Sequence, residues 1–158
     1  MAVEIERKFL VDPNKWSPNN QGTKMIQAYL SVAPHPTVRV RLAGVKAFLT
    51  IKGRSDSIAR PEFEYEIPVA DADELFKMAI SFPVEKTRYE VLYEGFLWEV
   101  DIFSGKNSGL VLAEIELEDI NQEFPYPDWI LTEVSNDMRY YNSYLSGRPF
   151  QEWRDDMA

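Results

Sequence analysis

The sequence predicts a mainly β protein of the α+β class, an eight-stranded antiparallel tunnel (a closed or partly open β-barrel) with flanking helices. Eight segments are predicted to be strands, and seven of them alternate charged and apolar residues with the period of two that is typical of strands. Clusters of Pro, Gly, Asn and Ser separate these segments, and only two segments show a helical period. Eight strands are enough to close a sheet on itself. The length predicts a single domain over residues 1–158.

The predicted strands follow one another along most of the chain. In the first, residues 2–11, the charged Glu4, Glu6 and Lys8 share one face and apolar residues share the other. The remaining strands are expected at residues 24–32, 37–43, 46–53, 60–68, 84–93, 96–103 and 110–118, and all of them except residues 24–32 repeat this alternation.

Two segments are predicted to be amphipathic helices. Residues 71–80 carry acidic side chains in the first turn, where they complement the helix dipole, and apolar side chains along one side. Residues 135–147 begin with Ser135 or Asn136 as a plausible cap and end at Gly147. Both helices should pack their apolar side against the sheet.

Composition excludes several classes of function. The net charge of -9 should repel polyanions, so no nucleic acid or membrane partner is expected. Without cysteine, the chain has no disulfide, thiolate metal site or cysteine nucleophile. The single histidine, His35, lies in a proline turn and is not expected to be catalytic. No apolar run approaches a membrane span and the N-terminus lacks signal-peptide character, so a cytoplasmic location is expected.

The charged strand faces carry runs of like charge. Neighbours on one face are only about 6.5–7 Å apart, and a face that meets water gains nothing from such runs. Either these faces are solvated, or they converge in the lumen of the tunnel while the apolar faces point outward. In the second case the cations suit a ligand with several phosphoryl groups, and the carboxylates suit Mg²⁺ or Mn²⁺. The seven cations are Lys8, Arg39, Arg41, Lys52, Arg54, Lys86 and Arg88.

Seven ordered motifs carry a family resemblance. "EIERK", "RVR", "TIK", "EFEYE", "KTR", "EVD" and "EIELE" occur in this order between residues 3 and 145. Together they resemble the CYTH domain, that is, the triphosphate tunnel metalloenzymes, and in particular the short bacterial inorganic triphosphatases. The resemblance implies an eight-stranded tunnel in which a divalent metal supports the hydrolysis or rearrangement of triphosphate compounds.

The resemblance also implies roles for individual residues. The metal ligands would be Glu4, Glu6, Asp101, Glu114 and Glu116. The phosphates would be bound by Lys8, Arg39, Arg41, Lys52, Lys86 and Arg88, with Arg54 assigned to the same group. A further set of carboxylates would either orient these cations or help to hold a second metal: Glu62, Glu64, Glu66 and Glu118. Arg139 could reach the tunnel mouth or form a surface ion pair, and it is left out of the site.

Tyr29 is the remaining candidate. Strand parity points it toward the lumen together with Gln27. It is either a wall residue that bonds a carboxylate or, as the resemblance implies, the partner of Lys8 in a catalytic pair that positions and deprotonates the attacking water. Neighbouring cations would lower the pKa of Lys8 and neighbouring carboxylates would raise it. The sequence leaves that balance open.

The sequence thus predicts metal-dependent hydrolysis of inorganic triphosphate (tripolyphosphate) to diphosphate and phosphate. The alternatives are an adenylate cyclase, a thiamine or nucleoside triphosphatase, and a non-catalytic polyphosphate-binding module. Trp16, Trp98 and Trp129 could stack on an organic substrate group. Because two helices are too few to cover eight strands, we also expect either a homodimer or a sheet that is open along one side.

Overall fold

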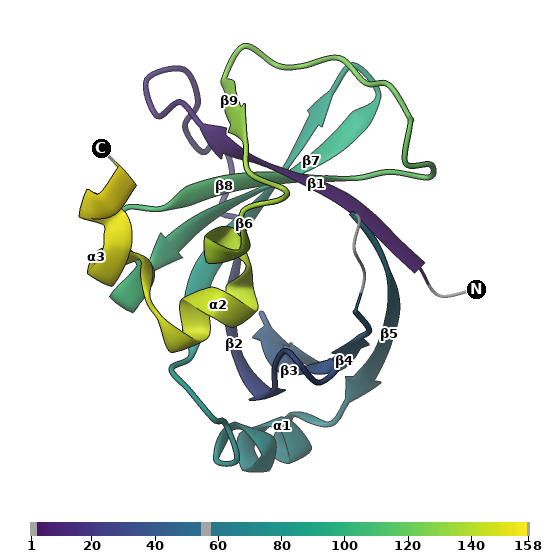
Figure 1. Cartoon of the computed structure of the whole chain (residues 1–158), viewed down its shortest axis with the longest axis vertical. Helices are drawn as coiled ribbons and strands as arrows, with labels where there is room; N and C mark the ends of the chain where they lie inside the picture. Colours follow the sequence, from purple (N-terminus) through teal and green to yellow (C-terminus); the bar gives the residue numbers. More distant parts are fainter. Residues whose placement is uncertain (1–2, 55–57, 158) are drawn as a thin grey trace.

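Eight antiparallel strands close into a tunnel in the computed structural model, which describes residues 3–54 and 58–157 (Figure 1). The sheet order is β5-β4-β3-β2-β6-β7-β8-β1, and a further pairing of β1 with β5 closes the ring. This confirms the predicted fold class. The strands are β1 (Val3–Val11), β2 (Thr23–Ser31), β3 (Thr37–Ala43), β4 (Lys46–Lys52), β5 (Ala59–Ile67), β6 (Val84–Tyr93), β7 (Phe96–Ser104) and β8 (Val111–Glu116). Ala2, the predicted start of the first strand, lies outside the described residues.

β1 closes the tunnel because it pairs on both edges. Residues Glu6–Leu10 pair with β8, and Val3–Ile5 pair with β5. A further strand, β9 (Ile130–Glu133), pairs with β1 at Phe9 and Val11, outside the ring of eight. The sequence analysis missed β9, since four residues directly after a proline-rich loop show too little alternation to be recognised.

A tight hairpin sets the register of β6 and β7. Glu94 and Gly95 both have positive φ, 47° and 83°, as a two-residue hairpin turn of the twist-matched kind requires. Tyr93 therefore pairs with Phe96, and further along the same ladder Arg88 lies directly opposite Asp101. This register decides the surroundings of both charged side chains.

The helices differ from their predictions in extent. α1 begins at Val69 and ends at Phe76, so it begins before Asp71 and ends before Ile80. The single helix predicted over residues 135–147 was wrong. That segment holds a 3₁₀ turn (Met138–Tyr140) and then α2 (Asn142–Gly147), which α3 (Phe150–Trp153) and a last 3₁₀ turn (Arg154–Met157) follow.

Local hydrogen bonds explain the break in the C-terminal segment. The Ser135 side chain accepts a bond from the backbone N–H of Lys8 at 2.9 Å, which holds this residue against β1 rather than in a helix. Tyr141 then adopts an extended conformation (φ -72°, ψ 137°), and its hydroxyl donates to the Ser135 carbonyl at 3.0 Å. A side chain that bonds outside its own segment competes with helix formation.

The apolar strand faces point outward and are covered by three groups of residues. Trp98, fully buried, packs with Phe9, Phe124 and Trp129, so the loop before β9 covers this side. A second group lies with Leu145 and the α3 residues, and a third lies against α1. Loops and the C-terminal turns thus provide cover that the two predicted helices could not. Every helix in the described ranges is too short or too polar to cross a bilayer.

Candidate functional site

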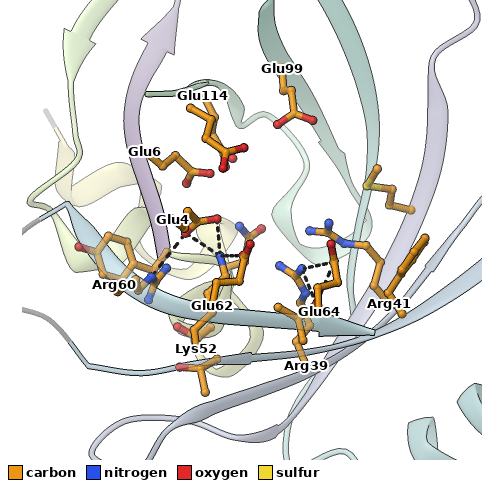
Figure 2. Close-up of a pocket in the computed structure, with 18 of the residues that line it drawn as sticks. Glu4, Glu6, Arg39, Arg41, Lys52, Arg60, Glu62, Glu64, Glu99 and Glu114 are labelled. Atoms are coloured by element: carbon orange, nitrogen blue, oxygen red, sulfur yellow. Dashed lines mark hydrogen bonds and ion pairs between the residues drawn. The ribbon is translucent and has the colours of Figure 1, made fainter. Parts of the chain in front are cut away.

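The tunnel encloses a polar cavity of about 290 Å³ (Figure 2). This is at the small end of the range of about 300–1,000 Å³ for ligand pockets. Inward-facing side chains of the ring of strands form its wall, and the segment at the start of α2 contributes Tyr141, Asn142 and Ser143. The site residues predicted from the sequence that line this cavity are Glu4, Glu6, Lys8, Tyr29, Arg39, Arg41, Lys52, Arg88, Glu114 and Glu116.

One wall of the cavity is rich in carboxylates. β1 and β8 pair so that Glu6 lies opposite Glu116 and Lys8 lies opposite Glu114. Figure 2 shows Glu6 and Glu114 side by side on this wall. Burial, together with the Glu114 and Glu4 carboxylates, raises the pKa of Glu6 well above its ordinary value. Crowded carboxylates of this kind are stabilised by a cation.

Lysines neutralise part of this wall. Lys52 Nζ lies 3.0 Å from Glu4 Oε1, and Lys8 Nζ lies 3.6 Å from Glu114 Oε1. Within residues 3–54 and 58–157, no three acidic or histidine side chains are already arranged as a metal site. The donor set nevertheless fits a divalent metal, because it consists of hard carboxylate oxygens and because Glu6 is destabilised as an anion where it stands.

Guanidinium groups gather on the other side of the cavity. Arg39 and Arg41 extend from β3 and Arg88 from β6. Burial and the neighbouring Arg39 and Arg88 lower the pKa of Arg41 to about 10. In addition, Nε of Arg39 is buried and has no hydrogen-bond partner among the described residues. Converging cations and an unsatisfied donor are the features that a bound polyanion would relieve.

A third group connects the two walls through β5. Arg60 Nε lies 3.6 Å from Glu4 Oε1, and Glu62 lies 3.4 Å from Lys52 Nζ. Glu64 lies 3.6 Å from Nη2 of Arg39. These contacts are among the dashed lines of Figure 2. The sequence analysis missed Arg60, although it has the same strand parity as Glu62 and Glu64 and so carried the necessary signal.

Lys86 and Asp101 lie behind the wall and are not among the residues that line the cavity. Their side chains have no exposure, and Lys86 Nζ donates to Asp101 Oδ2 at 2.8 Å. Asp101 also accepts from Nε and Nη2 of Arg88, each at 2.8 Å. Arg88 in turn reaches Glu99, which lines the cavity, at 3.2 Å. Asp101 therefore binds the Arg88 guanidinium from the side that faces away from the cavity.

Lys8 is buried among carboxylates and C-terminal residues. Its ammonium donates to the Tyr140 carbonyl at 3.2 Å and lies 5.5 Å from the centre of the Tyr141 ring. Burial by itself would lower the pKa of Lys8, but the Glu114 and Glu6 carboxylates outweigh it, and the pKa is raised. This resolves the balance that the sequence left open. Tyr141 was missed as a site residue because its segment was predicted to be a helix that packs its apolar side against the sheet, whereas the residue lies in the break before α2.

Tyr29 lines the cavity, and its hydroxyl is hydrogen-bonded to Gln27. Its side chain is almost completely buried, and its hydroxyl oxygen accepts a hydrogen bond from the Gln27 side chain at 3.3 Å. The partner in this bond is a neutral amide that donates, so the hydroxyl hydrogen of Tyr29 takes no part in it.

Several other candidates lie outside the cavity. Arg54 lines a neighbouring cavity of about 600 Å³, which shares Lys8, Lys52 and Arg60 with the first. Arg139 pairs with Asp137 at 2.7 Å. Five further candidates also line neither cavity: Glu66, Glu118, Trp16, Trp98 and Trp129. The three tryptophans pack in the core outside the tunnel, so they are not placed to stack on a substrate.

Comparisons with known proteins agree with this geometry. A family model described as the CYTH domain matches residues 2–144. An inorganic triphosphatase of Acetivibrio thermocellus is 46% identical over 98% of this chain and 100% of its own length. An inorganic triphosphatase of Nitrosomonas europaea is 37% identical over 91% of this chain and 97% of its own. A crystal structure described as that of an inorganic triphosphatase superposes with a TM-score of 0.64 at 36% identity, covering 92% of this chain and 95% of the other.

Proposed function

The chain belongs to the CYTH domain family, and from this premise we propose that it hydrolyses inorganic triphosphate to diphosphate and phosphate inside the tunnel. The observation that carries the proposal is the division of one small cavity into a guanidinium side and a carboxylate side. The first suits a chain of phosphoryl groups, and the second suits the metal that such a chain needs for charge neutralisation.

The phosphate chain would be bound by the cations that line the cavity. Arg39, Arg41 and Arg88 offer guanidinium donors, which match phosphoryl oxygens in pairs. Nε of Arg39, which has no partner among the described residues, is a donor that a phosphoryl oxygen would satisfy. Lys52 would exchange part of its contact with Glu4 for a phosphate oxygen. Lys86 is assigned no contact with substrate, because it lies behind the wall.

Enzymes of this family depend on a metal, and Glu4, Glu6, Glu114 and Glu116 would hold it here. We propose Mg²⁺ or Mn²⁺, because all four donors are carboxylates. A bound metal would polarise phosphoryl oxygens and neutralise charge that develops on them. Asp101, which the sequence analysis placed among the ligands, is assigned instead to the anchoring of Arg88.

Lys8 and Tyr29 would position the attacking water. The carboxylates around Lys8 raise its pKa, so the side chain stays an ammonium and acts as a hydrogen-bond donor rather than as a proton acceptor. The Tyr29 hydroxyl lines the same cavity and can orient the water in line with the bond to be broken. Fixed donors and cations that complement the developing charge account for most of the rate in phosphoryl transfer.

Phosphate release from four substrates tests the proposal. Triphosphate, diphosphate, ATP and thiamine triphosphate are incubated in parallel with Mg²⁺, Mn²⁺ or EDTA. We expect release from triphosphate to exceed release from the other three and to stop in EDTA. Preferred release from ATP or thiamine triphosphate would reassign the substrate. Absence of release from all four, with triphosphate still bound, would favour the non-catalytic module.

A further inference from the structure

Gln27 lies behind the tunnel wall, between two residues that line the cavity. Its side chain is fully buried, and it is not among the described residues that line the cavity. Its Oε1 accepts a hydrogen bond from Nε of Arg41 at 2.7 Å, and its Nε2 donates to the hydroxyl oxygen of Tyr29 at 3.3 Å. Gln27 and Arg41 are direct partners across the β2–β3 ladder, which keeps the two side chains together.

The chemistry of the three groups fixes the direction of both bonds. A guanidinium Nε–H can only donate, so the amide oxygen of Gln27 must face Arg41. The amide nitrogen therefore faces Tyr29, and because it can only donate, the Tyr29 oxygen must accept. The hydroxyl hydrogen of Tyr29 is then left to point elsewhere, and the cavity that Tyr29 lines is the space before it.

We propose that Gln27 is a positioning residue for the hydrolysis proposed above, on which this inference rests. Its oxygen accepts the hydrogen bond from Nε of Arg41, so that the terminal nitrogens of the guanidinium extend to the phosphate chain. Its nitrogen fixes the Tyr29 hydroxyl as a hydrogen-bond donor toward the reacting groups. One buried amide thus orients a phosphate-binding residue and a water-positioning residue together.

Two substitutions separate these two effects. Gln27→Met keeps a similar volume and removes both hydrogen bonds. Gln27→Glu keeps an acceptor for Arg41 but offers Tyr29 another acceptor, so the Tyr29 hydroxyl hydrogen turns away from the cavity and toward residue 27. Each substitution is made in the wild-type chain and in a Tyr29→Phe chain, and Glu152→Gln on the exposed surface of α3 is the control.

The measurements are kcat and KM for inorganic triphosphate at saturating metal, with circular dichroism and thermal melting to verify folding. We expect Gln27→Met to raise KM and to lower kcat by about tenfold each. We expect Gln27→Glu to lower kcat by at least tenfold in the wild-type chain and by less than threefold in the Tyr29→Phe chain, because the effect acts through the hydroxyl.

The outcomes distinguish this inference from the proposed function. An active wild type whose kcat and KM stay within twofold in both folded variants would overturn the role of Gln27 alone. The role of Gln27 would also be overturned if Gln27→Glu lowered kcat as much in the Tyr29→Phe chain as in the wild-type chain. A wild type that releases no phosphate from triphosphate would instead refute the hydrolysis, and the role of Gln27 with it. If Gln27→Met does not fold, the Gln27→Glu pair of chains decides.

Discussion

Removal of Asp101 should be far more damaging than removal of Lys86, although the two residues form one ion pair. Asp101 accepts three hydrogen bonds of 2.8 Å, one from Lys86 and two from Arg88. Asp101→Asn removes the carboxylate that both cations contact; Lys86 is fully buried, and Arg88 keeps only its longer contacts to Glu99 and Glu114. Removal of one partner from a buried ion pair typically costs about 3–5 kcal/mol, and we expect a loss in that range.

Lys86→Met leaves a balanced pair. Asp101 keeps both bonds from Arg88, and one anion still faces one cation. Burial lowers the pKa of Lys86 to about 7, which means that keeping the side chain charged in the folded protein costs free energy. Methionine fills much of the same space without that cost. We therefore expect a change in the free energy of unfolding of about 1 kcal/mol or less, in either direction.

Urea denaturation at pH 6, below the pKa of Lys86, measures both variants, with the slope of the transition compared to verify two-state behaviour. A loss in Lys86→Met as large as that in Asp101→Asn would refute the reasoning, since it would make the ammonium a net source of stability. Kinetics provide a second criterion. Lys86→Met should keep the KM for triphosphate within about threefold, because Lys86 does not line the cavity. A tenfold rise in a stable variant would show that the ammonium reaches substrate, as the family resemblance implied.

Three further predictions concern the metal wall, β9 and the core. Glu116→Gln should lower kcat for triphosphate by about a hundredfold or more while Glu152→Gln keeps it, and near-normal turnover would remove Glu116 from the metal site. Hydrogen bonds from Arg7 hold the pKa of Glu133 below its ordinary value of 4.5, so this pair stabilises the fold above that pH and the benefit is lost as the pH falls. Urea titrations should show Glu133→Gln less stable than wild type by up to about 1 kcal/mol at pH 7, and the gap should shrink as the pH falls toward 3; a gap that does not change with pH would contradict the assignment. Trp98→Ala should cost about 3–5 kcal/mol by chemical denaturation, since Trp98 is fully buried, and a loss under 1 kcal/mol would mean that Phe9 and Phe124 close the space.

The fold could be predicted from the sequence because its main signal is local. Alternation along each strand shows which residues share a face, and like charge on those faces indicates which face is enclosed. Parity and charge place Glu6, Arg39 and Glu114 on charged strand faces that are either solvated or turned into one lumen, and the family resemblance favours the lumen; all three line the cavity. The C-terminal segment could not be predicted in the same way. Its course depends on a bond between Ser135 and the backbone of Lys8, residues that are far apart in the chain.

Strand parity could not predict the distinction between lining residues and buried anchors. Asp101 shares its face with Glu99, yet Glu99 lines the cavity and Asp101 lies behind it. The difference comes from register, because the β6–β7 hairpin sets Asp101 directly opposite Arg88. An acidic residue in that position binds the guanidinium before it can bind a metal. The sequence thus identifies the charged residue types, and the partner that we propose for Asp101 is Arg88 rather than a metal.

The guanidinium groups of Arg39, Arg41 and Arg88 differ in how firmly the protein already holds them. Arg88 is bound from behind by two charge-assisted bonds to Asp101, and Arg41 by one bond to the neutral Gln27. The Nε of Arg39 has no partner among the described residues. Since a held guanidinium loses less conformational entropy when a phosphate binds, Arg88 should contribute to affinity mainly through preorganisation. Arg39 has a donor still to satisfy, so its contribution should depend on the substrate itself. Substrates that differ in phosphate number should therefore be discriminated at Arg39 more than at Arg88.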